Sequence, residues 1–257
     1  MRLNYIPEDF KTDDPEDEAI VSRVKERRGG KLLELDRTLL HAPPVADGWN
    51  SFLLSIRTKT TLSTSIRESA ICRVAILNKA FYEWDHHLPI LLSDPSFPPL
   101  GADYILKTPP GKAGQPLTSL ETASPSSVPQ QSETIPGSTG SKTVDSIVDS
   151  IAQATSSLLS SQSLTPAAPV IEQQRESHVL DDKHLAVLAY TDSMTLSVSV
   201  PEAVFASLKQ HFNEREIVEI TATIAAYNCV SRFLVALDVG ERVEKGMTSE
   251  GGGGQVE

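Results

Sequence analysis

Apolar residues recur every three to four positions over most of the first hundred residues, which is the spacing of helices that bury one face. The segment that follows Asp14 combines this spacing with helix-end signals. Asp14 can cap a first turn, Pro15 suits the first helical position, and Gly29-Gly30 follow the last turn. Acidic residues stand near the start and basic residues near the end, as the helix dipole favours. A helix is therefore predicted to run from Pro15 to the glycine pair.

Further segments have the same spacing. One helix is predicted to start after Pro44. The apolar residues on its predicted buried face are Val45, Trp49, Leu53 and Ile56. Another is predicted over residues 65–78. Its apolar face contains Ile66, Ala70, Val74 and Leu77. Three more are predicted over 183–196, 201–212 and 213–237. No run alternates convincingly as a strand does, so the sequence predicts an all-α fold.

The middle of the chain has a different composition. No Phe, Trp or Tyr occurs between Tyr104 and Tyr190, and Pro, Ser, Thr, Gly and Gln dominate. Such a segment buries too little apolar area to offset its conformational entropy. Within it, residues 142–159 have the spacing of a short amphipathic helix. The sequence therefore predicts four parts: a helical part over 1–97, a low-complexity insertion or linker over 98–177, a second helical part over 178–239 and a disordered tail over 240–257.

Charge and cysteine content exclude several classes of protein. The formal net charge is -11, so no basic surface is expected to attract nucleic acid or an anionic membrane. No apolar run approaches the roughly 20 residues that a membrane span needs, and the acidic N-terminal segment is not a signal peptide. We therefore expect a cytoplasmic protein. Cys72 and Cys229 lie far apart in apolar runs, and we expect both to be reduced and buried.

The stretch "AFYEWDHHLPI", residues 80–90, contains a candidate site. Glu83 and His87 are four residues apart and share one face of a helix. The apolar stripe beside them consists of Phe81, Trp84, Leu88 and Leu91. A carboxylate and an imidazole together suit general acid–base chemistry. The alternatives are an ordinary exposed pair, or a metal site that adds His86, although no His-Glu-x-x-His spacing occurs.

Glu68 allows two interpretations. Its spacing from Ser65 is that of a capping box, which alone would explain it; Asn213 and Glu216 have the same spacing. A role beside His87 is the alternative. A straight helix would separate Glu68 from His87 by roughly 28 Å, so the chain must turn back between them. Asn78-Lys79 is the candidate break. Pro89 is expected to end or kink the second helix.

The ordered run Arg67-Glu68, "VAILN" and "YEWDHH", preceded by residues 39–50, resembles the carboxymuconolactone decarboxylase-like family. This family also contains the AhpD-type peroxidases, and residues 188–239 look like the matching segment of fungal-type members. The resemblance covers roughly 30–97 and 178–239. It implies an AhpD-like helical bundle built on helical hairpins, without metal or organic cofactor, assembled as a homo-oligomer, a trimer or hexamer.

The resemblance also bears on chemistry. AhpD-type members carry a redox CxxC whose places are Ala80 and Glu83 here, so a disulfide-based peroxidase mechanism is not available. The lactone decarboxylases instead resemble this chain in Glu68, Glu83 and His87. The resemblance therefore implies a cofactor-free decarboxylase of an unsaturated lactone or a cyclic keto or ring carboxylic acid, in aromatic catabolism or secondary metabolism.

This resemblance leads to a hypothesis for the site: His87 is the acid, Glu83 orients it, and Glu68 relays protons or holds the pair. The expected partner is a small carboxylic acid or lactone, with no nucleic acid and no membrane. Two alternatives remain open: a different proton-transfer reaction such as isomerisation or lactone hydrolysis, or a non-catalytic oligomeric scaffold of the same fold. The insertion favours the scaffold slightly, because interaction segments are often disordered.

Overall fold

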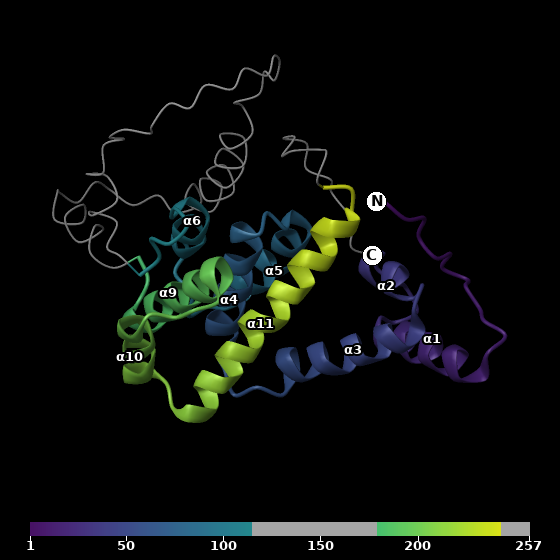
Figure 1. Cartoon of the computed structure of the whole chain (residues 1–257), viewed down its shortest axis with the longest axis horizontal. Helices are drawn as coiled ribbons and strands as arrows, with labels where there is room; N and C mark the ends of the chain where they lie inside the picture. The colour runs from purple at the N-terminus through teal and green to yellow at the C-terminus, as the bar shows by residue number, and fades with distance from the viewer. Residues whose placement is uncertain (115–178, 243–257) are drawn as a thin grey trace, which may run out of the picture. The chain divides into compact units, whose positions relative to one another are not determined.

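A computed structural model of the chain describes residues 1–114 and 179–242, and every regular element within these ranges is a helix (Figure 1). The helices are α1 Pro15–Arg27, α2 Glu34–Leu39, α3 Pro43–Thr58, α4 Thr64–Leu77, α5 Phe81–Ser93, α6 Gly101–Lys107, α9 Asp182–Ser197, α10 Glu202–His211 and α11 Glu214–Leu237. The predicted all-α fold is confirmed for this part of the chain.

Helix α4 lies at the centre of the bundle. It packs against α5, α6, α9 and α11, and its residues from Ser65 to Ala75 are buried with the exception of Arg67. Because α4 has neighbours on several sides, its polar residues Glu68 and Arg73 are buried together with its apolar ones. Of the predicted face, Ile66, Ala70 and Val74 are buried, whereas Leu77 at the helix end is half-buried.

The longest helix, α11, crosses the bundle and packs on α3, α4, α5, α9 and α10 (Figure 1). Within the described ranges it is the one helix whose length and composition would suffice to cross a membrane. Its buried apolar residues pack in the core of the bundle, among them Ile224, Val230 and Leu234. Core packing is therefore enough to account for its apolar character.

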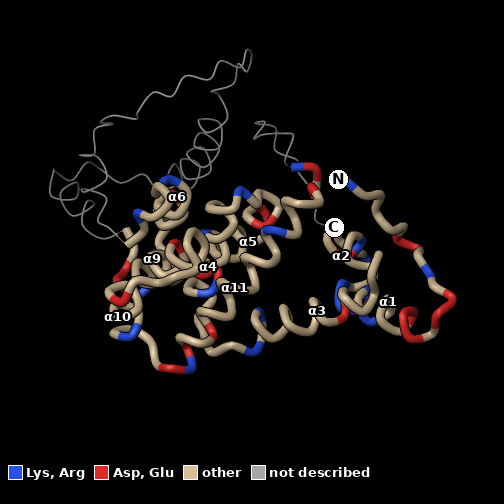
Figure 2. Tube along the Cα trace, viewed as in Figure 1, with Lys and Arg blue, Asp and Glu red and all other residues tan. Residues whose placement is uncertain are grey.

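The N-terminal helices largely follow the local signals. Asp14 caps α1, where its Oδ1 accepts hydrogen bonds from the backbone N–H groups of Glu16 at 2.8 Å and Asp17 at 3.1 Å. Helix α3 begins at Pro43, two residues earlier than predicted, because a proline fits the first turn. The prediction for Val45 was wrong: it is 54% exposed, since the buried stripe runs through Ala46, Leu53 and Ile56. Acidic and basic residues both occur throughout these elements (Figure 2).

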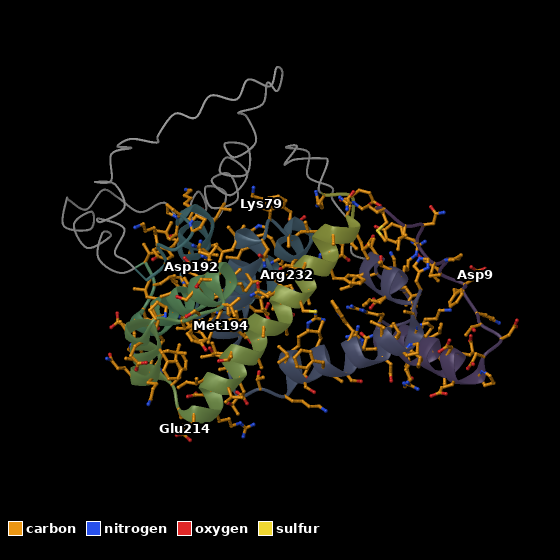
Figure 3. The ribbon with its side chains drawn as sticks, viewed as in Figure 1. Asp9, Lys79, Asp192, Met194, Glu214 and Arg232 are labelled. Atoms are coloured by element: carbon orange, nitrogen blue, oxygen red, sulfur yellow. The ribbon has the colours of Figure 1, made fainter. Side chains whose placement is uncertain are left out.

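Helices α4 and α5 form a hairpin. The predicted break is confirmed, with α4 ending at Leu77 and capped by Asn78. The left-handed residue is Lys79, with φ of 56°, and not Asn78 (Figure 3). Of the two outcomes expected at Pro89, the end of the helix is not found, because α5 continues to Ser93. Asp85 and Pro89 lie on the exposed side of α5, where water can satisfy the carbonyl that loses its helical partner.

The folded part extends further than predicted on the N-terminal side of the insertion. Helix α6 lies inside the segment 98–177 that was assigned to a linker, and it buries Ala102, Tyr104 and Ile105. The boundary at residue 98 was therefore too early, because one short helix has too few apolar positions to show a period. The helix predicted over 142–159 lies outside the described residues, as does the predicted tail from residue 243.

A buried ion pair holds this extension in place. Arg73 on α4 and Asp192 on α9 form two hydrogen bonds, of 2.6 and 2.9 Å. The Nη1 atom of Arg73 donates to the backbone carbonyls of Ile105 and Thr108, and its Nη2, which also bonds to Asp192, donates to that of Pro109. Asp192, labelled in Figure 3, also accepts from the backbone N–H groups of residues 111 and 113. The pair thus ties residues 105–113 to the core.

Candidate functional site

The α4–α5 hairpin brings Glu68 and His87 together. The Nδ1 atom of His87 lies 2.6 Å from Oε2 of Glu68, and both side chains are buried. The Nε atom of Arg67 donates to the other Glu68 oxygen at 3.1 Å. Glu68 therefore accepts on both oxygens, and His87 carries its ring hydrogen on Nδ1.

The capping interpretation of Glu68 was wrong. The N-cap of α4 is Ser63, whose hydroxyl accepts from the backbone N–H of Ile66 at 3.2 Å, and Ser65 lies inside the helix. A reciprocal capping box occurs at the other predicted position, between Asn213 and Glu216 at the start of α11. Glu68 is thus free of any capping role and points into the core beside His87.

Glu83 has a different partner from the one predicted. Its two oxygens lie 3.1 Å from the hydroxyl of Ser231 on α11, and its side chain is 2% exposed. No hydrogen bond joins Glu83 to His87, which instead bonds to Glu68. The hypothesis that Glu83 orients His87 was therefore wrong: Glu68 occupies that position, and Glu83 is a separate buried acid of the same site.

The surroundings of Glu83 favour its protonated form. The Ser231 hydroxyl has one hydrogen, and its shortest contact is 2.8 Å to the Tyr227 carbonyl, which can only accept. The same hydroxyl lies 3.1 Å from both Glu83 oxygens, so its one hydrogen is shared between the Tyr227 carbonyl and Glu83 and only partly compensates the burial of the carboxyl group. Burial raises the pKa of Glu83 well above its usual range, while Ser231 and the charge of Arg57 oppose the shift. Glu83 therefore keeps its proton to higher pH than an exposed glutamate does.

His87 is shifted in the opposite sense. Burial lowers the pKa of His87, although the hydrogen bond and the charge of Glu68 act against this. Its Nε2 atom has no hydrogen-bond partner in the described part of the chain, and the ring lines a pocket. A neutral imidazole with Nδ1–H bonded to Glu68 presents a lone pair on Nε2, which makes His87 a proton acceptor.

Glu68, Glu83 and His87 all line one pocket of about 320 Å³, so the structure brings the three predicted residues together. His86 lines it as well, and its Nδ1 lies 2.7 Å from the Tyr82 carbonyl. The remaining wall comes from α1–α3, the start of α4, α5 and α11. Among the described residues, no three His, Cys, Asp or Glu side chains converge as metal ligands.

Sequence reasoning missed Arg57 and Tyr227. The Nε atom of Arg57 on α3 donates to the Tyr227 hydroxyl on α11 at 2.7 Å, and Arg57 lines the pocket. The His87 ring packs edge-on against Tyr227, with 4.9 Å between ring centroids. The sequence signal for Arg57 was a single basic residue in the last turn of a helix. A basic residue at that position is also typical of an interaction with the helix dipole, so the signal did not single out a site residue.

The cysteines do not form a redox pair. Both are free; Cys72 is buried in α4 and Cys229 is exposed on α11. The prediction that both are buried was therefore wrong for Cys229, because its position lies on the outward side of α11. Burial raises the pKa of the Cys72 thiol well above its usual range, and the nearby charges of Glu68 and Glu83 act in the same direction. Cys72 is thus a poor nucleophile.

Comparison with known proteins places this arrangement in a fold. No protein-family model matches the chain, and no curated protein matches it at a significant level. Solved structures do match. An uncharacterized peroxidase-related protein from Silicibacter sp. TM1040 is 15% identical with a TM-score of 0.54, covering 97% of this chain and 95% of that one.

A second match is described as an alkylhydroperoxidase AhpD core, an uncharacterized peroxidase-related protein from Ralstonia eutropha JMP134. It is 14% identical with a TM-score of 0.56, and the match covers 96% of this chain and 95% of that one. The chain has an AhpD-like fold. This confirms the predicted architecture, and at such low identity the likeness shows the fold alone.

Proposed function

We propose that this AhpD-like chain is a cofactor-free carboxy-lyase that acts on a small unsaturated lactone or a cyclic keto or ring carboxylic acid. The observation that carries the proposal is that a buried acid, Glu83, lines the same pocket as the hydrogen-bonded Glu68–His87 pair. The pocket volume of about 320 Å³ suits a small ring compound.

The reaction needs an electron sink and a proton donor. The bond between the ring carbon and the carboxylate breaks, CO₂ leaves, and the electron pair moves into the conjugated carbonyl. The resulting enolate carbon must then receive one proton. Glu83 is suited to this step because burial raises its pKa and so favours the protonated form, which carries no charge that would repel the incoming carboxylate.

His87 and Glu68 have a complementary role in this proposal. Once Glu83 has given up its proton, it is a buried carboxylate and must be reprotonated from solvent. His87 is slightly exposed to the pocket and can carry that proton through Nε2. Glu68 holds the ring through Nδ1 and stabilises the imidazolium that forms in passing. Glu68 is therefore the positioning residue, and Glu83 and His87 handle protons.

A second reaction is favoured by the same protonation states. A neutral imidazole and a neutral carboxylic acid in one pocket can remove a proton at one carbon and return another elsewhere, which is an isomerisation. This alternative needs no carboxylate on the substrate. It differs from decarboxylation in that no CO₂ is formed and solvent hydrogen is incorporated into otherwise unchanged material.

The test uses the full-length protein and a panel of unsaturated lactone acids and cyclic keto acids in deuterated buffer. Release of CO₂, with one deuterium on the ring carbon that carried the carboxylate, supports the lyase. This turnover should fall about 10²-fold or more in Glu83→Gln. Deuterium incorporation without CO₂ would assign the isomerase instead. A panel without turnover by either readout would favour the scaffold alternative. The homo-oligomer and the cytoplasmic location stay predictions.

A further inference from the structure

The pocket has three arginines in its wall, and their charges are not equivalent. Arg28 lies with its Nε 2.7 Å from a carboxylate oxygen of Asp36, and Arg67 bonds to Glu68. Arg57 forms no ion pair with any carboxylate in residues 1–114 or 179–242. Its single hydrogen bond there is to the neutral Tyr227 hydroxyl. Arg57 is thus the cation of the pocket whose charge no described carboxylate balances.

The position of Arg57 is held from two sides. Its Nε is fixed by Tyr227 at 2.7 Å, and its guanidinium carbon lies 5.7 Å from the centre of the Tyr227 ring. The two terminal nitrogens have no partner in the described residues, so they remain free to bind an anionic oxygen. Arg57 lines the same pocket as Glu83 and His87, and its charge lowers the pKa of both.

We infer that Arg57 is a catalytic residue that binds the electron-sink oxygen of the substrate, the carbonyl oxygen that becomes an enolate oxygen when CO₂ leaves. This inference rests on the proposed lyase function. An interaction accelerates a reaction only if it is stronger in the transition state than in the ground state. A cation on the leaving carboxylate would stabilise the ground state, whereas a cation on the carbonyl oxygen gains strength as negative charge develops there.

The step balances with the groups already named. The bond to the carboxylate breaks, its electron pair passes to the carbonyl oxygen beside Arg57, and neutral CO₂ departs. The enolate pair then forms a new C–H bond with the proton of Glu83. The pocket should therefore prefer a ring enolate over a neutral lactone of the same size, because only the enolate places a full negative charge on the oxygen that faces Arg57.

The preference can be measured without knowing the substrate. Tetronic acid is a lactone that exists as its ring enolate at neutral pH, and 2(5H)-furanone is a neutral lactone of similar size. Calorimetric titration should show that the wild-type protein binds tetronate about tenfold or more tightly than the furanone, the scale of one charged hydrogen bond. Arg57→Gln should remove this preference, with a much smaller loss of affinity for the neutral furanone than for tetronate, and Arg57→Lys should keep part of it.

Two matched variants separate charge from structure. Tyr227→Phe removes the hydrogen bond that fixes Arg57 but leaves the charge, so it should weaken the preference less than Arg57→Gln does. Arg232→Gln removes an exposed arginine of α11, labelled in Figure 3, whose hydrogen bonds within residues 1–114 and 179–242 go to Asn228, and both affinities should stay unchanged. Thermal unfolding of each variant checks that the fold is retained.

Several outcomes would overturn the assignment. One is equal affinity of the wild-type protein for tetronate and furanone, and another is a tetronate preference that survives in Arg57→Gln. A third uses 2-furoate, a ring carboxylate titrated in the same way: a larger loss of affinity for 2-furoate than for tetronate in Arg57→Gln. The last result would mean that Arg57 binds the substrate carboxylate. The binding test is independent of turnover, so a failure of the lyase assay alone would refute the proposed function while leaving the anion preference of Arg57 measurable.

Discussion

Glu68 and His87, nineteen residues apart in the chain, form a buried hydrogen bond of 2.6 Å across the α4–α5 hairpin. Neither residue has another role that would explain its burial, since the α4 cap is Ser63. Burying a carboxylate and an imidazole in the core costs free energy, and this cost is unusual unless the pair serves a site.

The first prediction concerns this pair. Glu68→Gln keeps the shape of the side chain but cannot stabilise an imidazolium, so turnover should fall about 10²-fold or more, and His87→Gln should cause a similar loss. The double variant should be no worse than the larger single loss, because residues that act as a unit are not additive. Steady-state kinetics on a substrate from the panel measure this.

A matched control exists for that experiment on the same helix. Ser63→Ala removes the true N-cap and should lower the free energy of unfolding by about 0.5–2 kcal/mol with turnover unchanged. If Ser63→Ala and Glu68→Gln instead affected stability and turnover alike, Glu68 would be a structural residue and not part of a site.

The second prediction concerns Glu83 and stability. Its folded-state pKa is raised, so its stabilising contribution is fully present below the unfolded-state pKa and is lost as pH rises through the folded-state pKa. Glu83→Gln mimics the neutral form and has no such loss. The stability of the wild type should therefore decline relative to Glu83→Gln as pH is raised above the usual carboxyl range, in urea titrations at a series of pH values. Parallel profiles would mean that Glu83 is ionised in the folded protein.

The third prediction concerns His87, whose pKa is lowered by burial. The contribution of a neutral buried imidazole is present above the unfolded-state pKa and is lost as pH falls through the folded-state pKa. The wild type should lose stability relative to His87→Gln on acidification in this window. NMR titration of the His87 ring measures the shift directly, and a midpoint above the usual histidine value would contradict the prediction.

The fourth prediction concerns the buried pair of Arg73 and Asp192. Asp192→Asn leaves the Arg73 charge buried without a counter-ion, which should cost about 3–5 kcal/mol of stability in chemical denaturation. The control is the exposed pair of Arg23 with Asp47, where Arg23→Gln should cost about 1 kcal/mol or less. Equal losses in both variants would show that the Arg73–Asp192 pair does not anchor residues 105–113.

The fifth prediction concerns peroxidase chemistry. The AhpD thiol places are occupied by Ala80 and Glu83, and the buried thiol of Cys72 resists ionisation. No thiol-dependent turnover of a hydroperoxide is expected. If such turnover occurs and is abolished by Cys72→Ser or Cys229→Ser, then one of these cysteines is a redox centre and the present interpretation of the thiols is wrong.

Much of the local structure was predictable from the sequence. The caps at Asp14 and Asn213 depend on side chains within three residues of the groups they bind, and the break near Lys79 depends on a few neighbouring residues. Helical spacing likewise reports which face of a helix is apolar, so the all-α fold and most helix bounds followed from it. These features are local, and a linear pattern contains them.

The partners of the site residues were decided by the tertiary structure. Ser231 meets Glu83 across 148 positions, and Tyr227 meets Arg57 across 170. Spacing within one helix suggested that Glu83 pairs with His87, but α4 and α11 each supplied a nearer partner. Burial by these neighbours then fixed the protonation states, because the desolvation that shifts the pKa of Glu83 and His87 depends on which helices surround them and not on their order in the chain.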